Sequence, residues 1–175
     1  MNYRRFVLAV FAVLLVGQAH AQSGADLDRL DEKLGHFLET RMPGWTRARV
    51  EPIQGSKGQL IQVWSVQNRG VRISVSLLKT TEEAKEAMRS FVRDVKKAQS
   101  IGGLGDEAYT WGFQQRLLVF RRGRTVVNLE VGADVDADPD ARTLTWAERR
   151  AREQSEVKRI TSEFANNLLL VIDLP

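Results

Sequence analysis

Hydrophobic and polar residues alternate along several stretches of this chain in the way that strands of an antiparallel sheet require. Residues 71–77 alternate strictly, with valine, isoleucine and leucine on one face and arginine and serine on the other. Residues 60–66 and 116–120 are apolar on both faces, which is typical of inner strands that are covered on both sides. Residues 125–131 have one buried and one wetter face, so we predict that this strand lies nearer a sheet edge.

Turn-forming residues join these strands into two hairpins. The first hairpin pairs residues 60–66 with residues 71–78 across a turn over residues 67–70. The second hairpin closes at Gly123, because glycine can take the positive φ that tight hairpin turns use. A further short strand is expected within residues 45–52.

Apolar residues at helical spacing predict three helices. The first covers residues 23–42 and must end before Pro43, because a residue that precedes proline is disfavoured in helical geometry. The second is predicted from about residue 81 to 99, where an apolar stripe ends before two glycines. The third begins near Thr143 or Thr145 and carries an apolar stripe towards the end of the chain.

The order of these elements indicates the fold class. Residues 60–99 and 115–172 each read as a hairpin followed by a helix, which suggests a structural repeat. We therefore predict an α+β fold with an antiparallel sheet of about five strands from two hairpins, packed with three helices.

The first 21 residues have the three parts of a secretory signal peptide: two arginines, an apolar run over residues 6–16, and small residues up to Ala21. We expect cleavage near Ala21, a periplasmic or secreted location, and a single α+β domain over residues 22–175. A permanent membrane helix needs about 20 apolar residues. Because the run is shorter and polar sequence follows soon, no permanent membrane anchor is expected.

Composition narrows the possible chemistry. The chain has no cysteine, which excludes a disulfide framework and thiol catalysis. Its 26 basic and 22 acidic residues become 24 and 22 without the two leader arginines, a net charge of +2 that gives little reason to expect nucleic acid as a partner. Only His36 lies outside the leader, so a histidine triad or a multi-histidine metal site is excluded, and we predict no cofactor and no metal.

A run of aspartates has the every-other-residue rhythm of a calcium loop, at positions 134, 136, 138 and 140. However, Pro139 stands where such a loop needs glycine, and Thr145 stands where it needs a bidentate glutamate. We therefore favour a solvated acidic turn over weak calcium binding.

Residues 103–109, Gly-Leu-Gly-Asp-Glu-Ala-Tyr, follow a predicted helix and precede the second hairpin. This segment resembles a motif of small exported bacterial proteins, some of which are similar to extracellular sensor domains of actinobacterial kinases or to PsbP/Mog1-like α+β folds. The resemblance implies an exported recognition module and transfers no catalytic residue. Physically, the glycines allow a sharp exit from the helix and Asp106 can accept hydrogen bonds from nearby backbone amides.

The second hairpin carries a basic finger of Arg121, Arg122 and Arg124, with Arg116 near its other end. Two interpretations remain open. Either the arginines serve only as a soluble turn that protects the sheet from association, or they form a contact surface for a ligand.

Carboxylates offer the remaining route to catalysis. Asp106 and Glu107 are adjacent, but neighbours on a strand point to opposite faces and cannot flank one bond. We therefore expect no enzyme activity, and a cofactor-free carboxylate hydrolase is the alternative.

The leading hypothesis is an exported binding or interaction module for a protein or small-molecule ligand, which contacts its ligand through the basic hairpin and the second sheet face. A homodimer built through the stripe of the C-terminal helix is a further alternative. The candidate ligand-binding residues, two of them aromatic side chains from predicted strands, are Trp64, Trp111, Arg116, Arg122 and Asp106.

Overall fold

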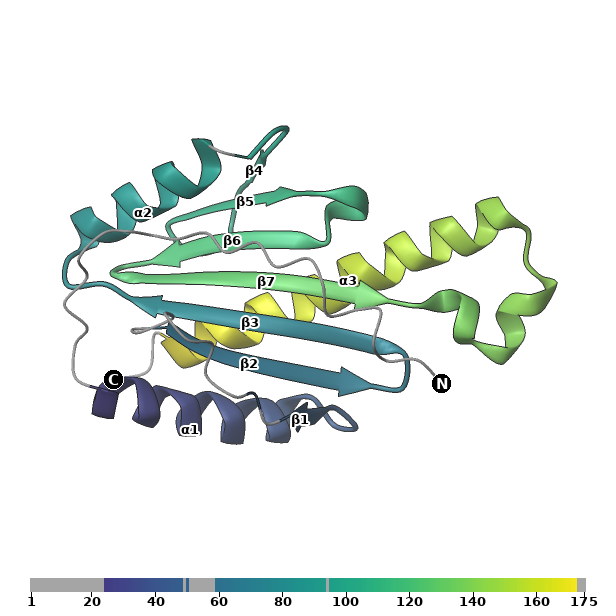
Figure 1. Ribbon diagram of the computed structural model, residues 1–175, viewed down its shortest axis with the longest axis horizontal. Helices are drawn as coiled ribbons and strands as arrows, with labels where there is room; N and C mark the ends of the chain where they lie inside the picture. The colour runs from purple at the N-terminus through teal and green to yellow at the C-terminus, as the bar shows by residue number, and fades with distance from the viewer. Residues whose placement is uncertain (1–23, 49, 51–58, 94, 173–175) are drawn as a thin grey trace.

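The computed structural model describes residues 24–48, 50, 59–93 and 95–172. Within them, three α-helices accompany one antiparallel sheet of seven strands in the order β1-β2-β3-β7-β6-β5-β4 (Figure 1). The α+β class, the three helices and the antiparallel pairing are thus confirmed, but the expected number of about five strands is wrong. The predicted leader lies outside the described residues.

The elements have the following bounds. The helices are α1 (Gly24–Arg41), α2 (Thr81–Arg93) and α3 (Trp146–Ile172). The strands are β1 (Thr46–Ala48), β2 (Gln59–Val66), β3 (Arg69–Leu77), β4 (Gln99–Ile101), β5 (Glu107–Trp111), β6 (Leu117–Arg122) and β7 (Thr125–Ala133). Short 3-10 turns are η2 (Phe113–Gln115), η3 (Val135–Ala137) and η4 (Pro139–Thr143).

The two predicted hairpins, β2–β3 and β6–β7, form the middle of the sheet and meet through antiparallel pairing of β3 with β7. The inner position predicted for β6 is confirmed, since it lies between β7 and β5. The position predicted for β7 near an edge is wrong, because β7 is the central strand. The alternation of apolar and polar residues indicates which faces of a strand are covered. Whether the strand is central depends on which strands form hydrogen bonds with its two edges.

Two strands of three residues each, β1 and β4, complete the sheet at its edges. The chain around β4 corrects the predicted second helix, because α2 ends at Arg93 rather than near residue 99. Lys97, beyond this end, has a φ of 65°, which is incompatible with a continuing helix, and Gln99–Ile101 then pairs with β5.

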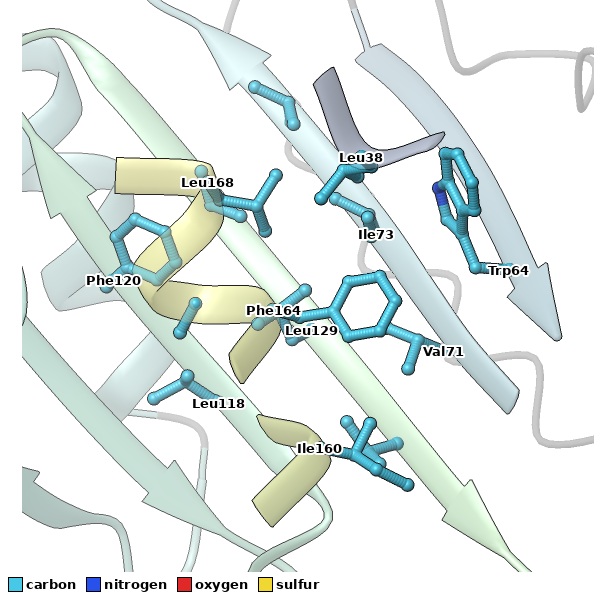
Figure 2. Packing of buried hydrophobic residues seen from close by; sticks show 14 of the residues in the cluster. Leu38, Trp64, Val71, Ile73, Leu118, Phe120, Leu129, Ile160, Phe164 and Leu168 are labelled. Atoms are coloured by element: carbon cyan, nitrogen blue, oxygen red, sulfur yellow. The ribbon is translucent and has the colours of Figure 1, made fainter. Parts of the chain in front are cut away.

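The main core lies between the sheet and the pair α1 and α3, and Figure 1 shows α3 running behind the sheet. Figure 2 shows Phe164 and Leu168 of α3 pointing towards Leu129 and Phe120 on the strands. The apolar stripe of α3 is fully buried there, at Val157, Ile160, Phe164, Leu168 and Val171. This stripe therefore does not offer the surface that the homodimer hypothesis needs. Each such large side chain contributes about 1.5–3 kcal/mol to folding.

Among the described helices, only α2 covers part of the other face of the sheet. Helix α2 packs over β6 and β7 and buries its own residues Ala84 and Met88. Over β2 and β3 the second face carries half-exposed polar residues such as Arg72 and Ser74. The described helices therefore leave a polar area beside α2.

Helix α3 begins directly after Thr145, one of the two residues near which the sequence predicts its start, and Thr145 forms a reciprocal cap with Glu148. The backbone N–H of Thr145 donates to Glu148 Oε2 at 2.7 Å, and the N–H of Glu148 donates to Thr145 Oγ1 at 3.3 Å. The hydrogen bonds that Glu148 accepts from Thr145 lower the pKa of this carboxyl group.

Candidate functional site

The tip of the β6–β7 hairpin is held by one buried arginine. Arg121 is only 5% exposed, and its guanidinium donates to Asp106 Oδ2 at 2.7 Å and to Glu107 Oε1 at 3.2 Å. It also donates to the carbonyl oxygen of Gly123 at 2.9 Å. Arg121 therefore does not belong to an exposed basic finger, and instead ties the hairpin to the start of β5.

Asp106 completes this fastening from the other side. Its carboxylate accepts the backbone N–H of Gly123 at 2.8 Å, and its own N–H donates to the Arg121 carbonyl at 2.8 Å. The N–H of Gly123, followed by the charges of Arg121 and Arg122, lowers the pKa of Asp106. The group therefore stays ionised at neutral pH and is engaged in structure.

A groove opens beside this fastened tip, where the start of α1, the hairpin and the end of α3 meet at one end of the sheet (Figure 1). Its volume is about 530 Å³, within the range of about 300–1,000 Å³ that small-ligand sites occupy. The apolar part of its lining is Leu30, Leu77 and Ile172. We call this cavity the basic groove.

The charged part of the lining is strongly positive. Cations come from two separate elements, α1 and the β6–β7 hairpin, and are Arg29, Lys33, Arg122 and Arg124. Among the lining residues that the structure describes, Asp26 is the one acid, so these residues carry 4 − 1 = 3 positive charges. Asp106 lies 3.4 Å from Arg122 and offsets part of this charge. A concave, positive wall attracts anions from solution.

Two of the predicted site residues meet at this groove, and three lie elsewhere. Arg122 lines the groove and Asp106 positions the tip that carries it. Arg116 precedes the opposite end of β6, where it forms an ion pair with Glu153 of α3. Trp111 packs edge-to-face against Phe91 of α2, with 5.3 Å between ring centroids.

Trp64 is fully buried in the core, so its side chain does not contribute to a contact surface (Figure 2). Its indole N–H donates to Gln62 at 2.9 Å, and Gln62 donates to the carboxylate of Asp31 on α1 at 2.8 Å. This part of β2 is therefore covered by α1 of the same chain.

Sequence reasoning missed the contribution of α1 to the groove. Arg29 and Lys33 are four residues apart, so they share one helical face, and this spacing was the available signal. Which hairpin that face would meet depends on the packing of α1 against the sheet, and periodicity does not report this.

The acidic segment after β7 is engaged with arginines. Asp138 is only 8% exposed and forms a bidentate pair with Arg69, at 2.9 and 3.0 Å. Asn68 donates to the same carboxylate at 2.8 Å, and Arg152 lies 3.3 Å away. The prediction of a solvated acidic turn is therefore wrong at Asp138, because the β2–β3 turn folds onto it. Across the described residues, no group of three or more acidic or histidine side chains could hold a metal ion.

None of the helices in the described part of the chain is both long and apolar enough to cross a membrane. Comparison with protein-family models, curated proteins and solved structures found no match.

Proposed function

We propose that the protein is an exported, non-catalytic binding module whose ligand is a small anion with an apolar portion, held in the basic groove. One observation carries the proposal: four cationic and three apolar side chains line the same cavity of about 530 Å³. The cations would bind the anionic group, and Leu30, Leu77 and Ile172 would cover the apolar portion.

The fastened hairpin tip supports this proposal. A binding surface gains affinity when its groups are already held in place before the ligand arrives. Asp106 and Arg121 fix the backbone at Gly123, and Arg122 and Arg124 flank that residue. These contacts therefore hold the backbone of Arg122 and Arg124, the two hairpin cations of the groove, in a defined position.

The state of the carboxylates favours binding over hydrolysis. A general acid needs a raised pKa, as a carboxyl group in an apolar pocket has. The pKa of Asp106 is lowered instead, because its Oδ2 accepts hydrogen bonds from Gly123 N–H and Arg121 and its Oδ1 faces Arg122 at 3.4 Å. A hydrolase based on Asp106 is therefore the weaker interpretation.

The test uses the fluorescent anion 1-anilinonaphthalene-8-sulfonate, which combines a sulfonate with fused and single rings. We expect saturable binding by the purified protein, weakened as salt is raised because exposed charges are screened. The variant Arg29→Glu/Arg124→Glu should weaken binding at least tenfold. The control Lys96→Glu/Lys158→Glu makes the same change in net charge at exposed positions outside the groove and should bind as the unchanged protein does.

Equal losses in both double variants would show that net charge alone drives binding and would refute the groove as the site. The compartment is tested separately by recovering the protein from the exported fraction and measuring its mass. Loss of residues 1–21 is expected, and an intact chain retained in the cytoplasm would contradict export.

A further inference from the structure

A second cleft lies at the other end of the sheet, between the end of β7, the β5–β6 connection and the start of α3. Its volume is about 200 Å³, and its lining includes Arg116, Trp146, Arg149 and Arg150. Two large aromatic side chains are exposed beside it: Phe113 at 59% and Trp146 at 66%. Clustered exposed apolar groups of this kind mark contact sites more often than scattered ones do.

Arg150 lies between these two aromatic rings. The centre of its guanidinium is 4.5 Å from the ring centroid of Phe113 and 4.7 Å from that of Trp146. Such distances are those of cation–π contacts. Contacts of this kind use no N–H group as a hydrogen-bond donor, so they leave the donors of the planar guanidinium available to an acceptor.

Arg150 differs from the other two arginines of the cleft in its pairing. Arg116 forms an ion pair with Glu153, and Arg149 lies 3.5 Å from Asp136. Within the described parts of the chain, Arg150 has no carboxylate and no hydrogen-bond acceptor. Of the three arginines, Arg150 is therefore the one whose N–H donors have no partner within the described residues.

The backbone of the β5–β6 connection holds Phe113 in this exposed position. Gly112, Gln114 and Gln115 all have positive φ, at 83°, 59° and 59°. Glutamine rarely adopts such angles, and backbone strain of this kind concentrates at ligand-contacting sites. The guanidinium carbon of Arg116 also lies 5.8 Å from the ring centroid of Phe113, so two arginines contact this ring.

The charges around the cleft limit which ligands it can bind. The described residues of its lining include three arginines and three acids, Asp134, Asp136 and Glu153, so their net charge is zero. A neutral lining does not attract a polyanion such as nucleic acid over a distance. It can accept one carboxylate, which matches the planar fork of a guanidinium in a bidentate pair.

We infer that this cleft is a second binding site, separate from the basic groove, for a single carboxylate carried next to a flat or apolar group. The carboxylate pairs with the in-plane donors of Arg150, and the flat group lies against Phe113 or Trp146. Two sources share this chemistry: a free aromatic acid, and an acidic residue beside an aromatic residue in a peptide.

Nuclear magnetic resonance tests the inference, because it detects weak binding at a named group. The probes are phenylacetate, its uncharged analogue phenylacetamide, and the capped tripeptide acetyl-Phe-Glu-Phe-amide. The readouts are the Nε–H signal of Arg150, assigned by its loss in Arg150→Lys, and the indole signal of Trp146, assigned by its loss in Trp146→Leu. We expect both signals to shift saturably with phenylacetate or the tripeptide, and the tighter ligand identifies the source.

The variants and the analogue decide the outcome. Phenylacetamide should bind at least tenfold more weakly than phenylacetate. Arg150→Lys, which keeps the charge but loses the planar fork, should weaken the acid at least fivefold as read at Trp146, while Arg89→Lys on the surface of α2 should have no effect. Equal binding of acid and amide, unchanged binding in Arg150→Lys, or no saturable shift with either carboxylate would overturn the inference. An equal affinity for inorganic phosphate would also overturn it.

Discussion

At position 105 the chain passes so close to the β6–β7 tip that a side chain has no room. Gly105 has a φ of 63°, and a Cβ placed there would collide with the carbonyl oxygen of Arg121. The same segment places Leu104 in the core and Asp106 at the hairpin tip. The glycine therefore determines how closely the two parts of the fastening approach each other.

We predict that Gly105→Ala destabilises the protein by about 2–5 kcal/mol, adding the cost of a left-handed residue to that of a steric clash. Gly123→Ala is the matched control, because Gly123 also has a positive φ but a Cβ added there would meet no atom within 4 Å. It should cost only about 1–2 kcal/mol. Urea unfolding measures both free energies, and equal losses would contradict the predicted clash.

The same residues show how far sequence reasoning extends at this scale. The sequence predicts that Asp106 binds backbone amides, and the structure confirms this with Gly123, 17 residues further along the chain. The location of that partner follows from the pairing of β5 with β6, which turn composition does not report. For the same reason Arg121 could not be distinguished in the sequence from its exposed neighbours.

Among the elements, the turn of the first hairpin is joined to the segment between β7 and α3. Arg69 binds Asp138 and also donates to Glu156 of α3 at 3.0 Å, so one side chain links three segments. The hydrogen bond from Arg69 is the main cause that lowers the pKa of Asp138, followed by that from Asn68. A carboxyl group with a lowered pKa in the folded state stabilises that state above its unfolded pKa.

We predict that Asp138→Asn lowers the free energy of unfolding by about 1.5–3 kcal/mol at pH 7, the range for hydrogen bonds to charged groups. Because the unfolded carboxyl takes up its proton first, near the ordinary pKa of 3.8, the difference from the unchanged protein should shrink below about pH 4. Urea unfolding from pH 7 to about pH 2.5 measures this. A difference that stays constant over that range would contradict the assigned role.

The exposed neighbour Asp136 provides the control for this experiment. Its side chain is largely exposed and lies 3.5 Å from Arg149, a surface pair of little energetic weight. Asp136→Asn should therefore change stability by no more than about 0.5 kcal/mol at any pH.

Elements with many side chains in a repeating pattern are predictable from the sequence, and short ones are not. The stripe of α3 and the alternation of β3 each span enough residues to show a period. β1 and β4 have three residues each, too few for any period. The sequence predicts too long a helix for α2 because Val95 and Ala98 continue its apolar spacing by coincidence, while Lys97 turns the backbone away.

For the whole molecule, the strand order predicts where the fold is most resistant to opening. β7 pairs with β3 over its whole length, Thr125–Ala133, and with β6 over Thr125–Glu130, whereas β1 and β4 are short edge strands. Backbone hydrogen bonds of a short edge strand open by local fluctuation, whereas those of a strand at the centre of the core open only when the whole protein unfolds.

We predict that backbone amides of β7 exchange with deuterium slowest in the chain, at rates close to those of global unfolding. Amides of β4 should exchange faster by orders of magnitude. Hydrogen exchange followed by mass spectrometry measures both, with β6 as an internal reference of similar burial. Comparable rates in β7 and β4 would contradict the observed strand order.

The two candidate sites could not be read from the sequence as separate places. Arg116 and Arg122 bracket one strand, and their spacing in the sequence suggests a common basic surface. In the folded protein they lie at opposite ends of β6, and each is joined by residues of a helix far away in the chain, Arg150 in one case and Arg29 in the other.

The contrast between Trp64, which is wholly enclosed, and Trp146, which is mostly in water, gives the protein an optical property of its own. A collisional quencher such as acrylamide meets the indole of Trp146 at once and reaches that of Trp64 only when the core opens. Trp45 and Trp111 are partly exposed, so Trp64 and Trp146 are the extremes of the four tryptophans. The most easily quenched part of the natural emission therefore reports on the aromatic cleft, and the most protected part reports on the integrity of the interior, without any attached dye.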